Sequence, residues 1–233
     1  MKQPTPDNQL GYPSLARIVP EDKAGPYEVR HTLLDEDRIY LDRLVATYGG
    51  HGWMYQGLVP GTYAVLTDDR DIIMSDTYLE RSTNNEVCQQ ANGNVLIAGL
   101  GIGLILTRIL PKPEVTTVTV IEKSQAIIDL VAAHHAHPKL QVLLGDVFEY
   151  EAPQRYDTIY FDIWPNISGD NYEATKDLHK RYRKWLNRKN PRAYMNSWVR
   201  DYIKKQYHKV RRQEALEETY MSSVQCLVEH GRS

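Results

Sequence analysis

Short apolar runs of strand length alternate with helical stretches along the central part of the chain. Asn94–Ala98 and Val115–Ile121 are apolar runs, the second rich in β-branched residues, and Ile102–Leu110 between them consists mostly of apolar helix formers. Leu140–Leu144 and Tyr156–Ile163 are further runs of strand length. Strands that alternate with helices in this way predict an α/β fold with a doubly wound, mostly parallel sheet.

The same reasoning extends the pattern to the end of the chain. Ser124 is expected to cap a helix that runs to about Ala133. Tyr172–Leu186 is a predicted helix, and Arg192–Val199 is a predicted fifth strand that leads into a long helix over Arg200–Glu218. Tyr220–Glu229 fits either a sixth strand or the end of that helix, and periodicity does not decide between them.

Proline dominates the start of the chain. Five of the first 30 residues are prolines and little periodicity accompanies them, so we predict an irregular arm that wraps the surface. His31–Tyr48 then has helical spacing of apolar residues and is followed by Gly49 and Gly50, which are typical of a helix end.

A small β element is predicted before the central unit. Tyr63–Thr67 and Ile72–Met74 flank the polar loop DDRD and predict a hairpin. Thr77–Gln90 is expected to form one helix that leads into the first strand of the α/β unit. We therefore divide the chain into residues 1–90, with the arm, the helix and the β element, and residues 91–233, with the sheet.

The strongest chemical signal is a glycine turn between a strand and a helix. Gly99, Gly101 and Gly103 let a ligand approach the backbone, and Glu122 follows Gly99 by 23 residues, near the spacing at which an acid binds ribose hydroxyls. Leu104 stands where a dinucleotide fingerprint has its third glycine, which disfavours a nicotinamide-dependent oxidoreductase.

Three successive strands end in acidic residues. Glu122, Asp146 and Asp162 each follow an apolar run. A single acid at a strand end is often a turn former or a helix cap. Because ligands of open α/β sheets bind beyond the carboxyl ends of the strands, three such acids beside a glycine turn predict one common pocket.

The segments VLIAGLGIG, VTVIEKS, VLLGDVFEY and YDTIYFDIWP resemble the class I S-adenosylmethionine-dependent methyltransferase fold and, within it, the spermidine-synthase-like branch. The resemblance covers about residues 54 to 200, because IIMSDTYLERSTNNEV is similar to the segment before the glycine loop of that branch. It implies a Rossmann-like domain that binds S-adenosylmethionine, with a small β domain in front of it.

The resemblance also implies roles for individual residues. The three glycines would surround the methionine part of the cofactor, Glu122 would bind the ribose hydroxyls, and Asp146 would hold the adenine amino group with Val147 beside the ring. Transfer would occur at Asp162. The predicted cofactor-binding residues are Gly99, Leu100, Gly101, Ile102, Gly103, Glu122, Lys123, Asp146, Val147 and Asp162.

Two departures from the branch weaken aminopropyl transfer as the reaction. Aminopropyltransferases carry an aspartate in the glycine loop, where this chain has Ile102, and a second one shortly after the fourth strand, where Trp164 and Pro165 stand. Asp162 with the residues that follow it resembles, loosely, the acidic-aromatic-proline stretch of amino-group methyltransferases. We therefore predict methyl transfer to a small amine or a nucleic acid, with Asp162 and Trp164 as catalytic residues; a catalytically silent nucleoside-binding protein is the alternative.

Charge is distributed unevenly along a chain whose formal net charge is only −2. Between Lys176 and Arg212 there are 14 Lys or Arg and two Asp, while the rest of the chain carries 14 basic and 28 acidic residues. A nucleic-acid partner would explain this basic segment. Surface helices with a solvated basic face explain it too, and we favour that interpretation because charge alone does not define a site.

Other features limit the classes of protein to be considered. No apolar stretch is long enough to cross a membrane and the first residues lack a signal core, so we expect a cytoplasmic protein without a membrane partner.

Cys88 and Cys226 are too few for a disulfide framework, and both are expected to be reduced and at least half-buried. His134, His135 and His137 are interpreted as residues of a helix end and not as metal ligands. The oligomeric state is left open, homo-oligomers included.

Overall fold

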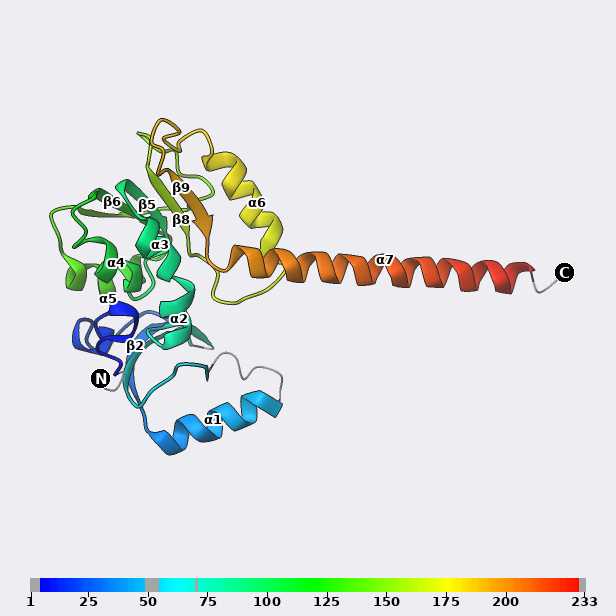
Figure 1. Cartoon of the computed structure of the whole chain (residues 1–233), viewed down its shortest axis with the longest axis horizontal. Helices are drawn as coiled ribbons and strands as arrows, with labels where there is room; N and C mark the ends of the chain where they lie inside the picture. The colour runs from blue at the N-terminus through cyan, green and yellow to red at the C-terminus, as the bar shows by residue number, and fades with distance from the viewer. Residues whose placement is uncertain (1–4, 49–54, 70, 231–233) are drawn as a thin grey trace.

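Five parallel strands form the main sheet of the protein, which we describe from a computed structural model (Figure 1). The structure describes residues 5–48, 55–69 and 71–230, with side chains as far as residue 218. The strands are β5 (Gly93–Ala98), β6 (Val115–Glu122), β7 (Leu140–Leu144), β8 (Thr158–Phe161) and β9 (Tyr194–Ser197), in the spatial order β7-β6-β5-β8-β9. All five predicted strands and the predicted fold class are confirmed.

Alternate residues of the strands face two separate groups of helices. Val95 and Ile97 of β5 belong to the core shared with α3 (Asn85–Gln90), α4 (Leu104–Ile109) and α5 (Gln125–Val131). Leu96 and Ala98 pack with Leu178 and Tyr182 of α6 (Asn171–Tyr182) on the opposite face. The sheet is therefore covered on both faces, as a doubly wound fold requires.

A four-stranded antiparallel sheet lies beside this domain. Its strands are β1 (Asp22–Ala24), β2 (Tyr27–Leu34), β3 (Gly61–Thr67) and β4 (Ile72–Ser75), in that order. β3 and β4 are the predicted hairpin. A single hydrophobic core contains residues of both sheets, among them Leu66 of the small sheet and Val95 of the large one. The division into residues 1–90 and 91–233 stays a prediction.

The N-terminal arm and the first helix differ from the prediction. Tyr12, Leu15 and Val19 are fully buried, so the arm, which includes the short 3-10 turns Gln9–Gly11 and Leu15–Arg17, is part of the core and not a surface wrapping. The segment before residue 30 also supplies β1 and the start of β2, which meet at a turn with Gly25 in a left-handed conformation.

The predicted helix over His31–Tyr48 is wrong in its first five residues. His31 to Leu34 complete β2, because they pair with β3 from Ala64 to Gly61. Helix α1 (Glu36–Tyr48) begins after Asp35, whose carboxylate accepts a hydrogen bond from the Arg38 backbone N–H at 2.8 Å. The expected end at Gly49 and Gly50 lies outside the described residues.

The predicted single helix over Thr77–Gln90 is two helices, α2 (Tyr78–Thr83) and α3. Asn84 separates them: it has ψ of 0°, and its side chain accepts a hydrogen bond from the Tyr160 hydroxyl at 2.9 Å. The hydrogen bond between Asn84 and Tyr160 in the core therefore determines where α2 ends and α3 begins.

At the other end, α7 (Arg200–His230) runs past its predicted end, so Tyr220–Glu229 is helical. Figure 1 shows α7 extending away from the rest of the protein.

A buried ion pair ties the N-terminal arm to the small sheet and to α2. Asp76 and Arg81 are fully buried and lie 2.9 Å apart. The Asp76 carboxylate also accepts backbone hydrogen bonds from Leu15 and Ala64, both at 2.8 Å, while Arg81 donates to the Pro6 carbonyl. Segments far apart in the sequence thus meet at one pair of charges.

We expect Asp76→Ala to lower the free energy of unfolding by about 3–5 kcal/mol, because Arg81 would remain as an uncompensated buried charge. Urea denaturation measures the change. Arg17→Ala is the matched control, because the Arg17–Asp7 pair is exposed and such pairs contribute less than about 1 kcal/mol. Similar small losses in both variants would contradict this role for Asp76.

Candidate functional site

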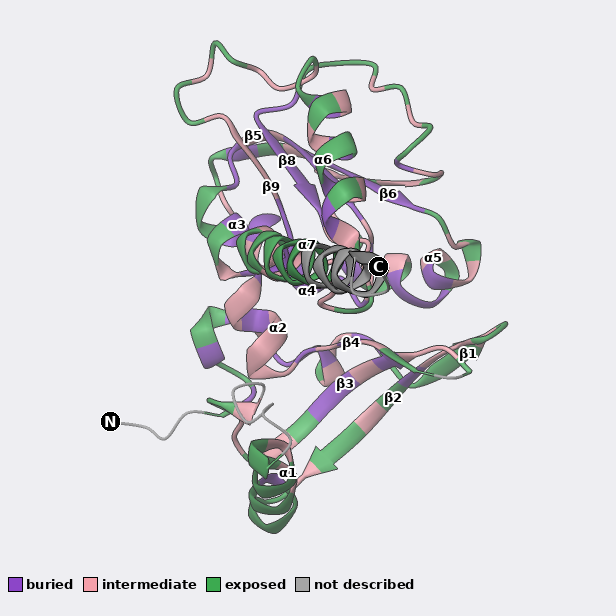
Figure 2. Ribbon diagram, turned by 90° about the vertical axis from the view of Figure 1, so that its right-hand side faces the viewer, coloured by how far each residue is buried: buried purple, intermediate pink, exposed green. Residues whose placement is uncertain are grey.

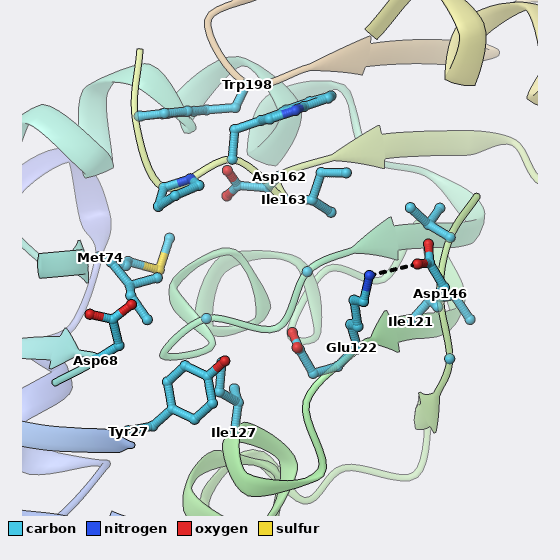
Figure 3. A pocket seen from close by; sticks show the side chains of 18 of the residues that line it. Tyr27, Asp68, Met74, Ile121, Glu122, Ile127, Asp146, Asp162, Ile163 and Trp198 are labelled. Atoms are coloured by element: carbon cyan, nitrogen blue, oxygen red, sulfur yellow. Dashed lines mark hydrogen bonds and ion pairs between the residues drawn. The ribbon is translucent and has the colours of Figure 1, made fainter. Parts of the chain in front are cut away.

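The largest cavity lies at the carboxyl ends of the parallel strands and has a volume of about 460 Å³. Strand register brings these ends together, since Ala98 pairs with Ile121 on one side and Phe161 on the other. Figure 3 shows Glu122 and Asp146 on the large-sheet side of the cavity and Asp162 near Trp198, with Met74 of the small sheet opposite. A cavity of this size can hold a nucleoside-sized ligand.

The glycine turn forms the floor of the cavity. Gly99 has a φ of +93°, and a Cβ at this position would collide with the carbonyl oxygen of Asp162. Gly101, with a φ of +51°, faces the Met74 sulfur in the same way. Larger side chains would therefore separate the turn from β8 on one side and from the small sheet on the other.

Glu122 fixes the conformation of this turn. Its carboxylate accepts a hydrogen bond from the Leu100 backbone N–H at 2.8 Å and another from the Ser124 N–H at 2.9 Å. Although Glu122 is buried, it also lines the cavity. A carboxylate has about four acceptor positions, so it retains capacity for hydroxyl groups of a ligand.

Asp146 lies at the end of the neighbouring strand. Its carboxylate accepts hydrogen bonds from the Lys123 ammonium and the Phe148 backbone N–H, both at 2.8 Å. The Lys123 hydrogen bond, followed by that of Phe148, lowers the pKa of Asp146. Ile121, Val147 and Phe148 line the cavity beside it and form an apolar slot next to an anionic group.

The remaining predicted cofactor residues lie away from the cavity lining. Leu100 and Ile102 are buried in the hydrophobic core, and Leu100 meets the site through its backbone N–H. Gly103 begins α4 and packs against His135. Ile102 therefore does not present its side chain to the cavity, at the position where aminopropyltransferases have an aspartate.

Asp162 lies at the end of β8 and lines the cavity together with Trp164. Burial raises the pKa of Asp162 to about 7, so its carboxyl group can hold or release a proton near neutral pH. Trp164 is half-buried and packs against the core on the α6 side while it borders the cavity. The structure thus brings both predicted catalytic residues to the same place, and their roles stay predictions.

Glu80 is a cavity residue that the sequence prediction missed. It lies on α2 and lines the cavity with Asp162. Burial raises the pKa of Glu80 well above its usual value, and the negative charge of Asp162 raises it further. The signal was present, because Glu80 belongs to the segment before the glycine loop on which the resemblance rests.

The small sheet supplies the rest of the wall that the sequence did not predict. Tyr27, Asp68, Ile73 and Met74 line the cavity, as does Trp198 after β9. Asp68 adds a third carboxyl group to those of Glu80 and Asp162. This side of the cavity is therefore acidic as well as partly apolar, which suits a cationic ligand.

One of the three histidines at the end of the α5 region, His135, lies next to the glycine turn. His135 is buried and its Nε2 lies 3.0 Å from the Ile102 carbonyl oxygen, directly behind the glycine turn. Burial lowers the pKa of His135, which favours the neutral ring. Within the described residues no cluster of His, Cys, Asp or Glu is arranged to hold a metal ion. His135 therefore supports the turn from the core side.

The predicted basic segment is divided between α6, the loop to β9 and α7. Lys176, Arg181, Lys184 and Arg211 form ion pairs with nearby glutamates. Lys204, Lys205 and Lys209 on α7 are exposed. The segment thus contains both internally paired and solvent-facing charge, and its partner stays a prediction.

In the described part of the chain, none of the helices is long and apolar enough to span a membrane.

No protein-family model and no curated protein matches the sequence. Solved structures similar to this chain include the complex of DhpI with SAH, at 20% identity and a TM-score of 0.36 over 46% of this chain and 50% of that one. The N-methyltransferase NodS from Bradyrhizobium japonicum WM9 has 16% identity and a TM-score of 0.37 over 46% and 62%. Spermidine synthase from Thermotoga maritima has 16% identity and a TM-score of 0.38 over 49% and 45%.

The chain spans about half to three fifths of the length of these structures. They comprise a protein in complex with SAH, an N-methyltransferase and a spermidine synthase. The strand order β7-β6-β5-β8-β9, with every strand parallel, is what carries the assignment of the fold. The chain has a Rossmann-like, doubly wound fold, extended by an antiparallel sheet.

The raised pKa of Asp162 predicts a specific dependence of stability on pH. Because the folded protein favours the neutral carboxyl, this contribution to stability is complete below about pH 4, the ordinary pKa of Asp, and is lost as the pH rises through about 7. The Asp162→Asn variant has no carboxyl group at this position, so its stability does not fall for this reason as the pH rises. In urea denaturation at several pH values, we expect the variant to gain stability relative to the wild type as the pH rises from about 4 to about 7.

Asp146→Asn is the control with the opposite sign. The lowered pKa of Asp146 stabilises the fold above the unfolded pKa, and this contribution disappears as the pH falls. Asp146→Asn should therefore lose stability relative to the wild type near neutral pH and recover it in acid. Parallel pH dependences for wild type and Asp162→Asn would contradict the environment described for Asp162.

Proposed function

We propose that this protein is an S-adenosylmethionine-dependent methyltransferase that acts on a small amine. The observation that carries the proposal is that one cavity is bordered by the glycine turn with Glu122 and Asp146 on one side and by Glu80 and Asp162 on the other. The first group suits a nucleoside, and the second group suits a cation that must lose a proton before it can react.

The residues of the first group fit the cofactor. Gly99 and Gly101 leave space where a Cβ would otherwise stand, so the methionine part could lie against the turn. The remaining acceptor positions of Glu122 suit the ribose hydroxyls, and Asp146 suits the adenine amino group with Val147 against the ring. When bound, S-adenosylmethionine supplies an activated methyl group.

Asp162 is the proposed general base. An amine acceptor is protonated in water, and its nitrogen needs a free lone pair to attack a methyl group. The carboxylate of Asp162, with a pKa of about 7, would accept that proton, Asp68 would attract the positive charge, and the Glu80 carboxyl group would lie beside it as a hydrogen-bonding group. The rest of the rate would come from alignment of the two reactants, with Trp164 against the acceptor.

The other candidate functions differ in specific residues. Aminopropyl transfer is the weaker one, because Ile102 is buried in the core and Trp164 and Pro165 border the cavity where the branch has a carboxylate. A silent nucleoside-binding protein would use the same glycine turn without turnover. A nucleic-acid acceptor would use the basic segment from Lys176 to Arg212, and it stays a prediction.

Calorimetry tests the cofactor site. We expect Glu122→Gln to weaken binding of S-adenosylmethionine or S-adenosylhomocysteine roughly 10- to 150-fold, because charge-assisted hydrogen bonds worth about 1.5–3 kcal/mol would be lost. Glu149→Gln is the matched control, since Glu149 is exposed and near Asp146 but does not line the cavity. Equal affinities of both variants would refute the ribose assignment, provided that urea denaturation shows both to be folded.

The dependence of activity on pH tests the base. With an amine acceptor, kcat/KM should rise with pH around 7, as Asp162 loses its proton. Asp162→Asn should abolish this rise and lower kcat/KM by at least about 100-fold. A variant with the wild-type pH profile would exclude Asp162 as the base. Formation of spermidine from putrescine and decarboxylated S-adenosylmethionine would favour aminopropyl transfer instead.

A further inference from the structure

Helix α1 carries an unusual set of exposed apolar side chains. Tyr40, Leu41, Leu44, Val45 and Tyr48 are 65, 55, 41, 72 and 87% exposed. We refer to these five residues as the α1 stripe. Ile39 is the only buried residue of this fully described helix. Figure 2 shows α1 as a largely exposed helix at the edge of the small sheet.

The spacing of these residues explains the exposure. At 100° per residue, positions i, i+1, i+4, i+5 and i+8 cover one side of a helix, and Ile39 lies almost directly opposite. The helix therefore rests on the protein through Ile39, and its apolar stripe faces outward. A surface helix normally has the reverse arrangement.

The exposed area of the α1 stripe is at the upper end of what a monomer normally presents. A complete aromatic side chain has 150–250 Å² of surface, so the exposed fractions correspond to roughly 500–600 Å² of contiguous surface. The largest apolar patch of a typical monomer has about this area and is often functional. Two such surfaces together would bury about 1,100 Å², which is near the lower limit for a specific protein–protein interface.

We propose that the α1 stripe binds the α1 stripe of a second copy of this chain in an antiparallel pair. Tyr40 and Tyr48 lie at equal distances on either side of Leu44, with the aliphatic Leu41 and Val45 between them. A two-fold axis through Leu44 places Tyr40 beside the partner subunit's Tyr48 and brings the two Leu44 side chains together. Such self-complementarity is what an isologous dimer requires.

The charges of α1 fit this partner better than a lipid surface. The helix carries Glu36, Asp37 and Asp42 against Arg38 and Arg43, a net charge of −1. Helices that lie on anionic membranes are rich in Lys and Arg on the polar face. An antiparallel pair of helices also opposes the two helix dipoles favourably. The proposal does not depend on the function of the cavity.

Sedimentation velocity tests the proposal on the full chain. An interface near the lower size limit is expected to be weak and reversible, so the protein should shift from a 26.9 kDa monomer toward a dimer as its concentration rises from about 1 μM to about 200 μM. Leu44→Asp should shift the midpoint at least tenfold toward higher concentration, because the two-fold axis would bring the two carboxylates together. Leu216→Asp, at a 63% exposed apolar position on α7, is the matched control and should change nothing.

A cross-link tests the antiparallel register. In a Cys226→Ser background, Leu44→Cys should give a disulfide-linked dimer upon oxidation, whereas Tyr48→Cys alone should not, because its neighbour is the partner subunit's Tyr40. A monomer at all concentrations would overturn the proposal, and so would a dimer that Leu216→Asp dissociates. Flotation of a monomeric wild-type protein with phosphatidylglycerol vesicles, abolished by Leu44→Asp, would overturn it in favour of a membrane surface.

Discussion

The buried ion pair between Asp76 and Arg81 determines where the second wall of the cavity stands. Asp76 accepts backbone hydrogen bonds from the arm and from β3, and Arg81 holds α2 in the same cluster. Glu80 is the residue before Arg81, so the contact that anchors α2 also fixes a carboxyl group beside Asp162. Such a pair adds little net stability because both charges lose their hydration, but it specifies a single arrangement of these segments.

A second constraint is the close approach of backbone to backbone at the end of the sheet. Gly99 lies against the Asp162 carbonyl oxygen, and the Leu100 N–H reaches the Glu122 carboxylate. The glycine turn, the ribose-binding candidate and the candidate base are thus connected through main-chain contacts at the ends of three strands. Their relative positions depend on strand register, which is rigid, and not on long side chains. This rigidity is what alignment of two reactants requires.

Local patterns predicted the large sheet well and the small sheet poorly. Runs such as Val115–Ile121 are bounded by prolines and acids, so their strands could be recognised without knowledge of their partners. Leu33 and Leu34 fit both a strand and a helix, and pairing with β3, some 30 residues away, decides between them. The resemblance pointed to the segment that contains Glu80, but the place of this side chain in the cavity depends on contacts of Arg81 and Asp76 with residues 61 to 75 positions away.

In the proposed function, the strand ends around Glu122 hold the nucleoside of the cofactor. A crystal structure of the protein grown with saturating S-adenosylhomocysteine would locate that nucleoside. We expect ribose hydroxyls within hydrogen-bond distance of the Glu122 carboxylate, the adenine beside Val147, and the sulfur on the side of Asp162. A ligand bound elsewhere on the protein, or an empty cavity at saturating ligand, would contradict it.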